Sequence, residues 1–150
     1  MTAVNPEQDG SALLKEARQC LERAYAPYSQ FPVAAAVVDE HGRVFTGINI
    51  ENVSYGLTMC AERVAIFTAI AAGAHRINAV ALTAEKMKLV TPCGACRQVM
   101  AEFCHPETPV FLDTGTAVPR TTTVGDLLPD AFTQDNLNQP FPVSQASTAG

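Results

Sequence analysis

Strands and helices alternate along most of this chain, and that order limits the folds open to it. A helix is predicted at 11–25 with Ser11 as its N-cap, and a hairpin follows at 33–38 and 44–50, turning at Gly42. Apolar patterning then predicts a buried helix at 60–72, a strand at 79–83 and a second core helix at 94–103. Another strand is predicted at 109–112 and a last helical turn at 124–128. We therefore expect an α/β fold, with a mixed sheet of about five strands and helices on both faces in α/β/α layers.

Length and composition favour one globular domain. The 150 residues are 47% hydrophobic and 17% charged, which is enough apolar material for a core that does not need disulfide bonds. We expect a single domain over 1–150, with a polar lead at 1–10 and a flexible tail at 138–150.

Charge and hydropathy exclude several kinds of partner. The net charge is −5, and no basic cluster offers a footprint for a nucleic acid. The N-terminal segment lacks the features of a signal peptide, and the longest apolar runs, 32–38 and 64–74, are too short to cross a bilayer. We therefore expect a cytoplasmic protein that binds neither nucleic acid nor membrane. Because thiols stay reduced in that compartment, clustered cysteines indicate metal ligands or catalytic groups.

Three of the five cysteines stand at the starts of predicted helices. Cys60 precedes one helix, and Cys93 and Cys96 open another in a Pro-Cys-x-x-Cys segment, which places their sulfurs on one helical face. Free N–H groups at helix N-termini favour the thiolate form. Three thiolates can hold a tetrahedral zinc ion and leave its fourth position to water, which is typical of catalytic sites. The pattern predicts one zinc per subunit, whereas Cys20 and Cys104 are predicted to pack in the core.

Charged residues beside these cysteines suggest how such a site works. Three thiolates leave Zn²⁺ with a charge of about −1, and Arg63 and Arg97, each next to a ligand, are expected to offset it by donating hydrogen bonds to sulfur. Glu62 lies on a helix that is apolar on most faces, so we expect it to point inward, where a carboxylate without a role is costly. Glu62 is therefore the candidate that takes a proton from water at the metal and passes it on.

In the segments around Cys60, Cys93 and Cys96, the sequence resembles cytidine deaminases of the small, homotetrameric type that hold zinc with three cysteines. The similarity covers about 12–137 and extends to further motifs, namely APYS at 26–29, FPV at 31–33, NIEN at 49–52, YGLT at 55–58, CGACRQ at 93–98 and LLPDAF at 127–132. One position departs from the family pattern, because Ala34 stands where glycine is usual. We expect its methyl group to tighten the pocket floor or to shift the strand.

The resemblance implies a hydrolase that deaminates cytidine and deoxycytidine to uridine and deoxyuridine with release of ammonia, a reaction of pyrimidine salvage. It implies that Glu62 moves a proton from water to ring N3 and then to the leaving amine. It also implies that Phe31 packs on the base and that Asn49 and Glu51 hold the sugar 3′-hydroxyl. The backbone carbonyl of Ala61 is implied to accept from the amine.

The resemblance further implies a homotetramer in which Tyr55 and Phe132 complete the active sites of neighbouring subunits. From the residues alone, Tyr55 and Phe132 are equally compatible with core packing, and Asn49 and Glu51 with a polar strand end and turn. A carboxylate near the sugar suits an uncharged nucleoside and repels a 5′-phosphate. Two other functions remain open. One is deamination of a related aminopyrimidine nucleoside such as a nucleoside antibiotic, and the other is a non-catalytic protein whose zinc is structural and has a fourth protein ligand.

Overall fold

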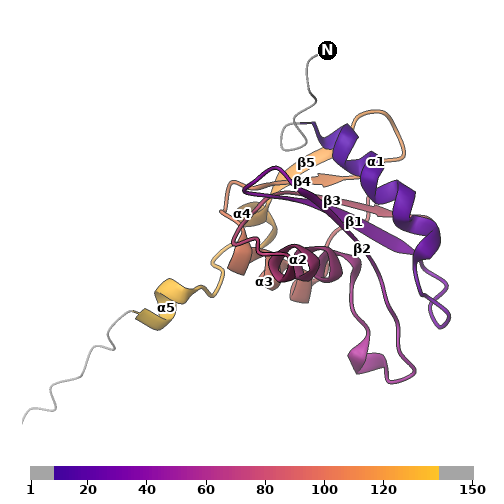
Figure 1. Cartoon of the computed structure of the whole chain (residues 1–150), viewed down its shortest axis with the longest axis horizontal. Helices are drawn as coiled ribbons and strands as arrows, with labels where there is room; N and C mark the ends of the chain where they lie inside the picture. The colour runs from indigo at the N-terminus through magenta and orange to yellow at the C-terminus, as the bar shows by residue number, and fades with distance from the viewer. Residues whose placement is uncertain (1–8, 139–150) are drawn as a thin grey trace, which may run out of the picture.

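The structure is a computed structural model and describes residues 9–138. Within this range, one five-stranded sheet runs in the order β2-β1-β3-β4-β5, with β3 and β4 parallel and the other neighbours antiparallel (Figure 1). The strands are β1 (Val33–Asp39), β2 (Val44–Ile48), β3 (Ile77–Ala84), β4 (Pro109–Leu112) and β5 (Arg120–Thr123). The prediction of a mixed sheet is confirmed.

Helices cover both faces of the sheet. α1 (Gly10–Cys20) lies on one face, and α2 (Ala61–Ala71) and α3 (Gly94–Phe103) lie on the other (Figure 1). Side chains alternate along each strand: Ala36 and Val38 of β1 pack towards α1, whereas Ala35 and Val37 pack towards α2 and α3. This arrangement confirms the α/β/α layers. Two 3₁₀ turns, η1 (Leu21–Arg23) and η2 (Tyr55–Leu57), and two short helices, α4 (Val124–Leu127) and α5 (Gln134–Asn138), complete the described chain.

Small residues let α2 lie very close to the sheet. A Cβ atom at Gly47 of β2 would come within 2.4 Å of both the Ala61 carbonyl oxygen and the Ala65 nitrogen. Only glycine allows this approach of two backbones. The first turn of α2, which follows Cys60, is therefore fixed directly against β2.

The ends of the first helix differ from the prediction. Asp9, not Ser11, is the N-cap: its Oδ1 atom accepts the backbone N–H groups of Ser11 at 3.0 Å and Ala12 at 3.3 Å. The α-helix ends at Cys20 and continues as η1. A carboxylate caps as well as a serine hydroxyl does and also interacts favourably with the helix dipole.

β5 was not predicted from the sequence. Its residues, Arg-Thr-Thr-Thr, show no alternation of apolar and polar side chains, and the strand is an exposed to half-buried edge that pairs only with β4. Threonine's branched side chain suits a strand, but pairing with β4 decides the outcome. The predicted helical turn at 124–128 is confirmed as α4. The polar lead and the tail lie almost wholly outside the described residues.

Ala34 does not act as expected. Ala34 is fully buried. Because side chains alternate along a strand, it shares the face of Ala36 and Val38, which pack towards α1 and away from α2 and α3. Its pairing with Ile48 and Thr83 is regular, and the irregularity in β1 lies at Val38/Asp39 instead. The expected tightening of the pocket floor or shift of the strand is therefore wrong.

No helix within residues 9–138 combines the length and the apolar character that crossing a bilayer requires.

Candidate active site

Three cysteine sulfurs converge where the N-termini of α2 and α3 meet. Cys60 is the N-cap of α2, Cys93 is the N-cap of α3, and Cys96 lies in the first turn of α3. Their Sγ atoms all lie within 4.8 Å of one another, and those of Cys60 and Cys93 are 3.8 Å apart. Zn–S bonds of about 2.3 Å in a tetrahedron would separate two sulfurs by about 3.8 Å, so this donor set fits zinc. Within residues 9–138 no other group of His, Cys, Asp or Glu side chains forms such a cluster.

The three thiols differ in acidity. A hydrogen bond with Cys96 and one from Arg63 lower the pKa of Cys60 to about 5, against the opposing effect of burial. The same bond with Cys60, together with burial, raises the pKa of Cys96. The first negative charge of the cluster therefore resides on Cys60, and a metal ion must displace protons from the other ligands.

Glu62 points inward as predicted. Its side chain is only 4% exposed, and its Oε2 atom lies 3.6 Å from the Sγ atom of Cys96, which donates to it. Burial raises the pKa of this carboxyl group to about 7. A carboxyl group that titrates near neutrality can both take up and release a proton at physiological pH.

The two arginines next to the ligands have different contacts. The Nη2 atom of Arg63 donates to the Sγ atom of Cys60 at 3.3 Å, as expected, and its buried Nε atom has no acceptor among the described residues. Arg97 instead donates from Nε to the Pro92 carbonyl at 2.7 Å and from Nη1 to the Leu127 carbonyl at 2.9 Å. The expectation that Arg97 donates to a sulfur is wrong for the described chain.

A cavity of about 370 Å³ opens beside the cysteine cluster. This volume is within the range of small-molecule sites. Its lining brings together Ser29, Phe31, Val33, Asn49, Thr58, Cys60, Ala61, Glu62, Val90, Thr91 and Cys93. Five of these, namely Phe31, Asn49, Cys60, Glu62 and Cys93, were expected to bind substrate or metal or to act in catalysis through their side chains. No role was predicted for five further lining residues. Ser29, Val33 and Thr58 belong to the motifs that carry the resemblance, and Val90 and Thr91 directly precede Pro92.

Comparison with known proteins agrees with this geometry. Residues 7–112, which include all three clustered cysteines, match the cytidine and deoxycytidylate deaminase zinc-binding region. The chain belongs to this deaminase family. A cytidine deaminase of Halalkalibacterium halodurans is 49% identical over 130 residues, which is 87% of this chain and 98% of that protein. One of Mycobacterium tuberculosis is 42% identical over 132 residues, 88% of this chain and 96% of that protein. The crystal structure of cytidine deaminase from Burkholderia pseudomallei superposes with a TM-score of 0.76 at 50% identity, covering 81% of this chain and 97% of that one.

Ala61 is the first residue of α2, and this position determines the direction of its backbone groups. Its carbonyl oxygen lies against Gly47 of β2, next to the Ala65 nitrogen, in the direction of the helical i to i+4 bonds. The N–H group of Ala61, at the first helical position, has no partner within the helix. The Ala61 carbonyl is therefore directed along α2, and its role as an acceptor from the amine stays a prediction.

Asn49 supports the wall of the cavity. Its Oδ1 atom accepts from the Val33 backbone N–H at 3.0 Å, and its Nδ2 atom donates to the Phe31 carbonyl at 2.9 Å. These two bonds fix the residues that lead into β1. The amide has a second N–H, which is available to a ligand.

Glu51 lines an adjoining cavity of about 240 Å³ with Tyr28, Ser29, Tyr55 and Thr58. Its Oε1 atom accepts the backbone N–H groups of Ser29 at 3.0 Å and Tyr28 at 2.9 Å. Hydrogen bonds from Ser29 and Tyr28 hold the pKa of this carboxyl group below its ordinary value. Ser29 and Thr58 line both cavities, so the cavity that contains Glu51 adjoins the deaminase cavity, although Glu51 itself lines only the first.

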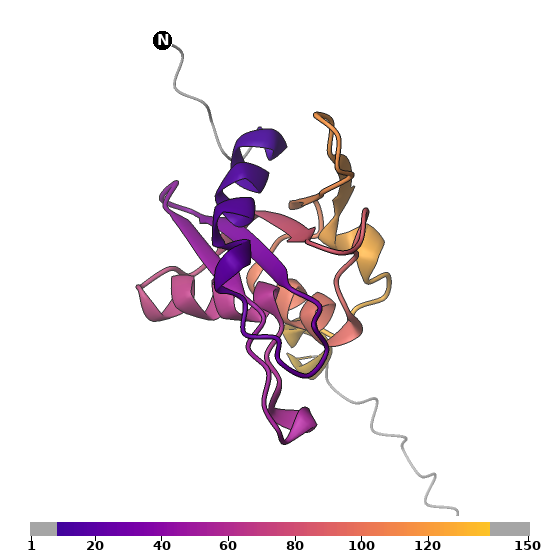
Figure 2. The same ribbon diagram turned by 90° about the vertical axis from the view of Figure 1, so that its right-hand side faces the viewer.

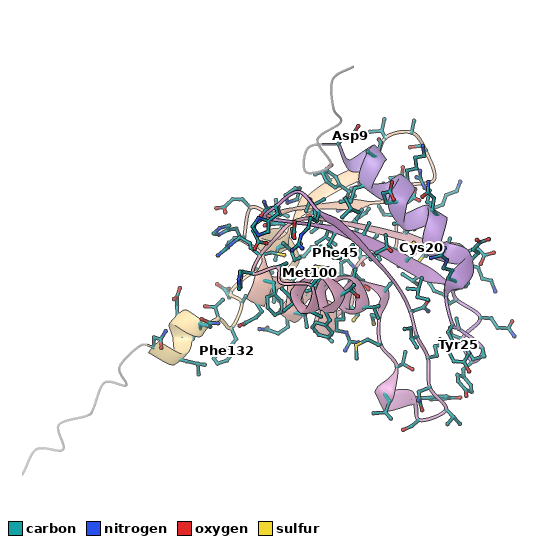
Figure 3. All side chains as sticks on the ribbon, in the orientation of Figure 1. Asp9, Cys20, Tyr25, Phe45, Met100 and Phe132 are labelled. Atoms are coloured by element: carbon teal, nitrogen blue, oxygen red, sulfur yellow. The ribbon has the colours of Figure 1, made fainter. Side chains whose placement is uncertain are left out.

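Tyr55 and Phe132 are not core residues. They are 75% and 61% exposed, and neither lines the deaminase cavity. The Tyr55 ring lies 5.9 Å from that of Tyr28, whereas Phe132 lies close to α5, on the opposite side of the molecule from Tyr25 (Figure 3). Core packing is therefore excluded for both side chains.

The two remaining cysteines stay apart from the cluster. Cys104 is buried in the core between the sheet and α3, as predicted, and burial raises its thiol pKa to about 12. Cys20 is only half-buried at the end of α1 and belongs to neither core cluster, so the prediction of core packing is wrong for it.

Proposed function

We propose that this chain is a zinc-dependent hydrolase that converts cytidine and deoxycytidine to uridine and deoxyuridine with release of ammonia. The observation that carries the proposal is one cavity lined by Cys60 and Cys93 of the three-cysteine cluster and by a buried carboxyl group, Glu62, whose pKa is raised to neutrality. The names of the related deaminases support the choice of a cytosine nucleoside. The expected setting is pyrimidine salvage in the cytoplasm.

The chemistry needs a stronger nucleophile than water and a route for two protons. When bound, zinc acts as a Lewis acid that lowers the pKa of a water molecule to about 7. Glu62, as the carboxylate, takes a proton from the attacking water and donates it to N3 of the ring, so that C4 becomes open to attack. The carboxylate then takes the second proton of the water and delivers it to the departing amine, which leaves as ammonia. Because the pKa of Glu62 is about 7, its carboxyl group can both accept and donate a proton near neutral pH.

Three side chains are proposed to hold the nucleoside. Phe31, which lines the same cavity as Glu62, packs on the base. The free N–H of Asn49 and the second oxygen of Glu51 bind the sugar hydroxyl, because each of these groups still has capacity after its bonds to the backbone. The negative charge of Glu51 repels a 5′-phosphate, which favours an uncharged nucleoside over a nucleotide.

We also propose that the chain works as a homotetramer of single-domain subunits in which Tyr55 and Phe132 complete neighbouring active sites. A loop at 50–59 extends from the body of the molecule (Figures 1 and 2). Around it lies a patch of exposed apolar side chains, Tyr25, Tyr28, Ile50, Val53, Tyr55 and Leu57. A patch of this kind supports association with a second subunit, and light scattering at micromolar concentration tests the mass.

The alternatives have lost their support. The antibiotic-deaminase alternative depended on Ala34, which does not line the cavity beside the cysteine cluster. The structural-zinc alternative needs a fourth protein ligand, and within residues 9–138 the cluster contains three.

The deciding experiment follows the absorbance of cytidine in the presence of protein whose zinc content has been measured. We expect one zinc per subunit, turnover of cytidine and deoxycytidine, and no turnover of cytidine 5′-monophosphate. Folded protein with a full complement of zinc that converts neither nucleoside would overturn the proposal.

A further inference from the structure

The three clustered cysteines are held in place by different means. Cys96 is fully buried within α3, and the sulfur of Cys60 accepts a hydrogen bond from Arg63. Cys93 is exposed and its side chain caps no helical N–H. Within residues 9–138, its sulfur makes hydrogen-bonding contacts with the other two thiols of the cluster, including the sulfur of Cys60 at 3.8 Å. The position of Cys93 therefore depends on the backbone that leads into α3.

Arg97 holds that backbone at two consecutive residues. Its backbone N–H donates to the Cys93 carbonyl at 3.0 Å, and its Nε atom donates to the Pro92 carbonyl at 2.7 Å. The Pro92 carbonyl precedes the N-cap, so the helix supplies no N–H for it. The side chain of Arg97 thus fixes the orientation of the peptide that joins Pro92 to Cys93.

The same guanidinium group connects this peptide to a distant part of the chain. Its Nη1 atom donates to the Leu127 carbonyl at 2.9 Å, at the end of α4 and 30 residues along the sequence. A guanidinium group is planar and rigid, so two such bonds fix the spacing and direction of the two carbonyls, which the single point charge of lysine cannot do. Both bonds are short and charge-assisted.

We propose that Arg97 is a positioning residue of the metal centre, which fixes the exposed ligand Cys93 by linking the Pro92 carbonyl to the end of α4. It acts through these two carbonyls and not through sulfur. Metal–ligand distances in such sites lie within about 0.2 Å of their usual values, so a rotation of the Pro92–Cys93 peptide that displaces the Cys93 sulfur is expected to weaken the site. The inference rests on the proposed function only in taking the three cysteines as zinc ligands.

Zinc affinity of the intact, zinc-loaded protein gives the first test. Arg97→Met removes both donors and keeps the apolar stem, and Arg97→Lys keeps the charge and one donor. The matched control is Arg120→Met, which removes a charge from an exposed position on β5. In competition with a chromogenic chelator, we expect Arg97→Met to lower the zinc affinity by about 10- to 100-fold, Arg97→Lys to lower it less, and the control to leave it unchanged.

Wild-type zinc affinity in folded Arg97→Met protein overturns the proposal. If Arg97→Met does not fold, the zinc affinity of Arg97→Lys is the test, and a wild-type affinity of that variant also overturns the proposal. Because no substrate is present, these results are independent of whether the protein deaminates cytidine.

Hydrogen exchange in the zinc-loaded protein separates the carbonyl route from a direct bond to sulfur. If Arg97 acts through the two carbonyls, Arg97→Met accelerates exchange both at the N–H of residue 97, which bonds to the Cys93 carbonyl, and at Leu128, whose N–H bonds to the Val124 carbonyl. Faster exchange confined to residue 97 would show that the side chain acts at the cysteine segment alone and would overturn the link to α4.

Discussion

Two buried carboxyl groups of this chain titrate in opposite directions. Glu62, 4% exposed, has a pKa raised to about 7 by burial, and its close contact is the thiol of Cys96. Asp113, 9% exposed, has a pKa lowered to about 2, chiefly by the hydrogen bond from Arg18. Arg18 binds it with two bonds of 2.6 and 2.7 Å, and Thr83 and the Gly115 N–H donate as well.

The difference lies in the partners and not in burial. Asp113 has a cation and neutral donors that satisfy its charge, so it stabilises the contact between α1 and the end of β4. Glu62 has no such set, and its ionised form is costly in the folded protein. A protein keeps a destabilised carboxyl group of this kind where it serves chemistry, and Glu62 lies beside the metal ligands.

The largest expected effect comes from Glu62→Gln. Removing the carboxyl group that we propose to transfer protons should lower kcat by about 10²- to 10⁴-fold, while zinc stays bound because Glu62 is not part of the three-cysteine cluster. Steady-state kinetics with cytidine and metal analysis check both parts. The control is Glu107→Gln at an exposed position, which should change neither. A variant with wild-type turnover would remove Glu62 from the mechanism and make it an ordinary buried residue.

Asp113→Asn should affect stability and not metal binding. It leaves Arg18 without its partner, and because the Arg18 side chain is 44% exposed, water compensates part of the loss. We expect the free energy of unfolding to fall by roughly 1–3 kcal/mol, measured by urea denaturation, with zinc content unchanged. Arg18→Lys should cost less, since it keeps the charge. An unfolding free energy of Asp113→Asn equal to that of the wild type would mean that the ion pair and hydrogen bonds of Asp113 do not stabilise the folded protein.

The smallest expected effect is the pH dependence of the difference in unfolding free energy between the wild type and Asp113→Asn. The pKa of Asp113 is lower in the folded protein than in the unfolded chain, so its contribution is complete above the unfolded value of about 3.9 and is lost as the pH falls towards 2. The gap in unfolding free energy between wild type and Asp113→Asn should therefore be constant above about pH 5 and shrink below pH 4. Comparing the two proteins cancels the loss of zinc in acid. A gap that does not narrow in acid would contradict the assigned charge state.

Much of the fold could be predicted because it depends on local pattern. The hairpin turn at Gly42 and the end of α2 at Gly73 both have positive φ angles, as glycine allows, and α3 and β4 have the predicted bounds. β5 was not predicted, because an edge strand of threonines becomes a strand only through its pairing with β4. The cap at Asp9 was missed because two adjacent capping candidates compete within one turn.

The candidate site divides in the same way. Cys60, Glu62, Cys93 and Cys96 could be identified because their spacing relative to two helix starts is a property of the sequence. Three other features could not be predicted, because each depends on a segment far away in the chain. They are the meeting of the two helix starts, the direction of the Ala34 methyl group and the carbonyls to which Arg97 donates.

The sequence alone therefore determined which residues can perform the chemistry, since period, capping and residue type act over a few positions. Only the tertiary structure decided what each of them touches. Glu62 has a neutral pKa because the packed sheet and helices exclude water, and Arg97 holds backbone because α4 folds against the start of α3. Both outcomes arise from contacts between residues that are distant in sequence, which local patterns do not encode.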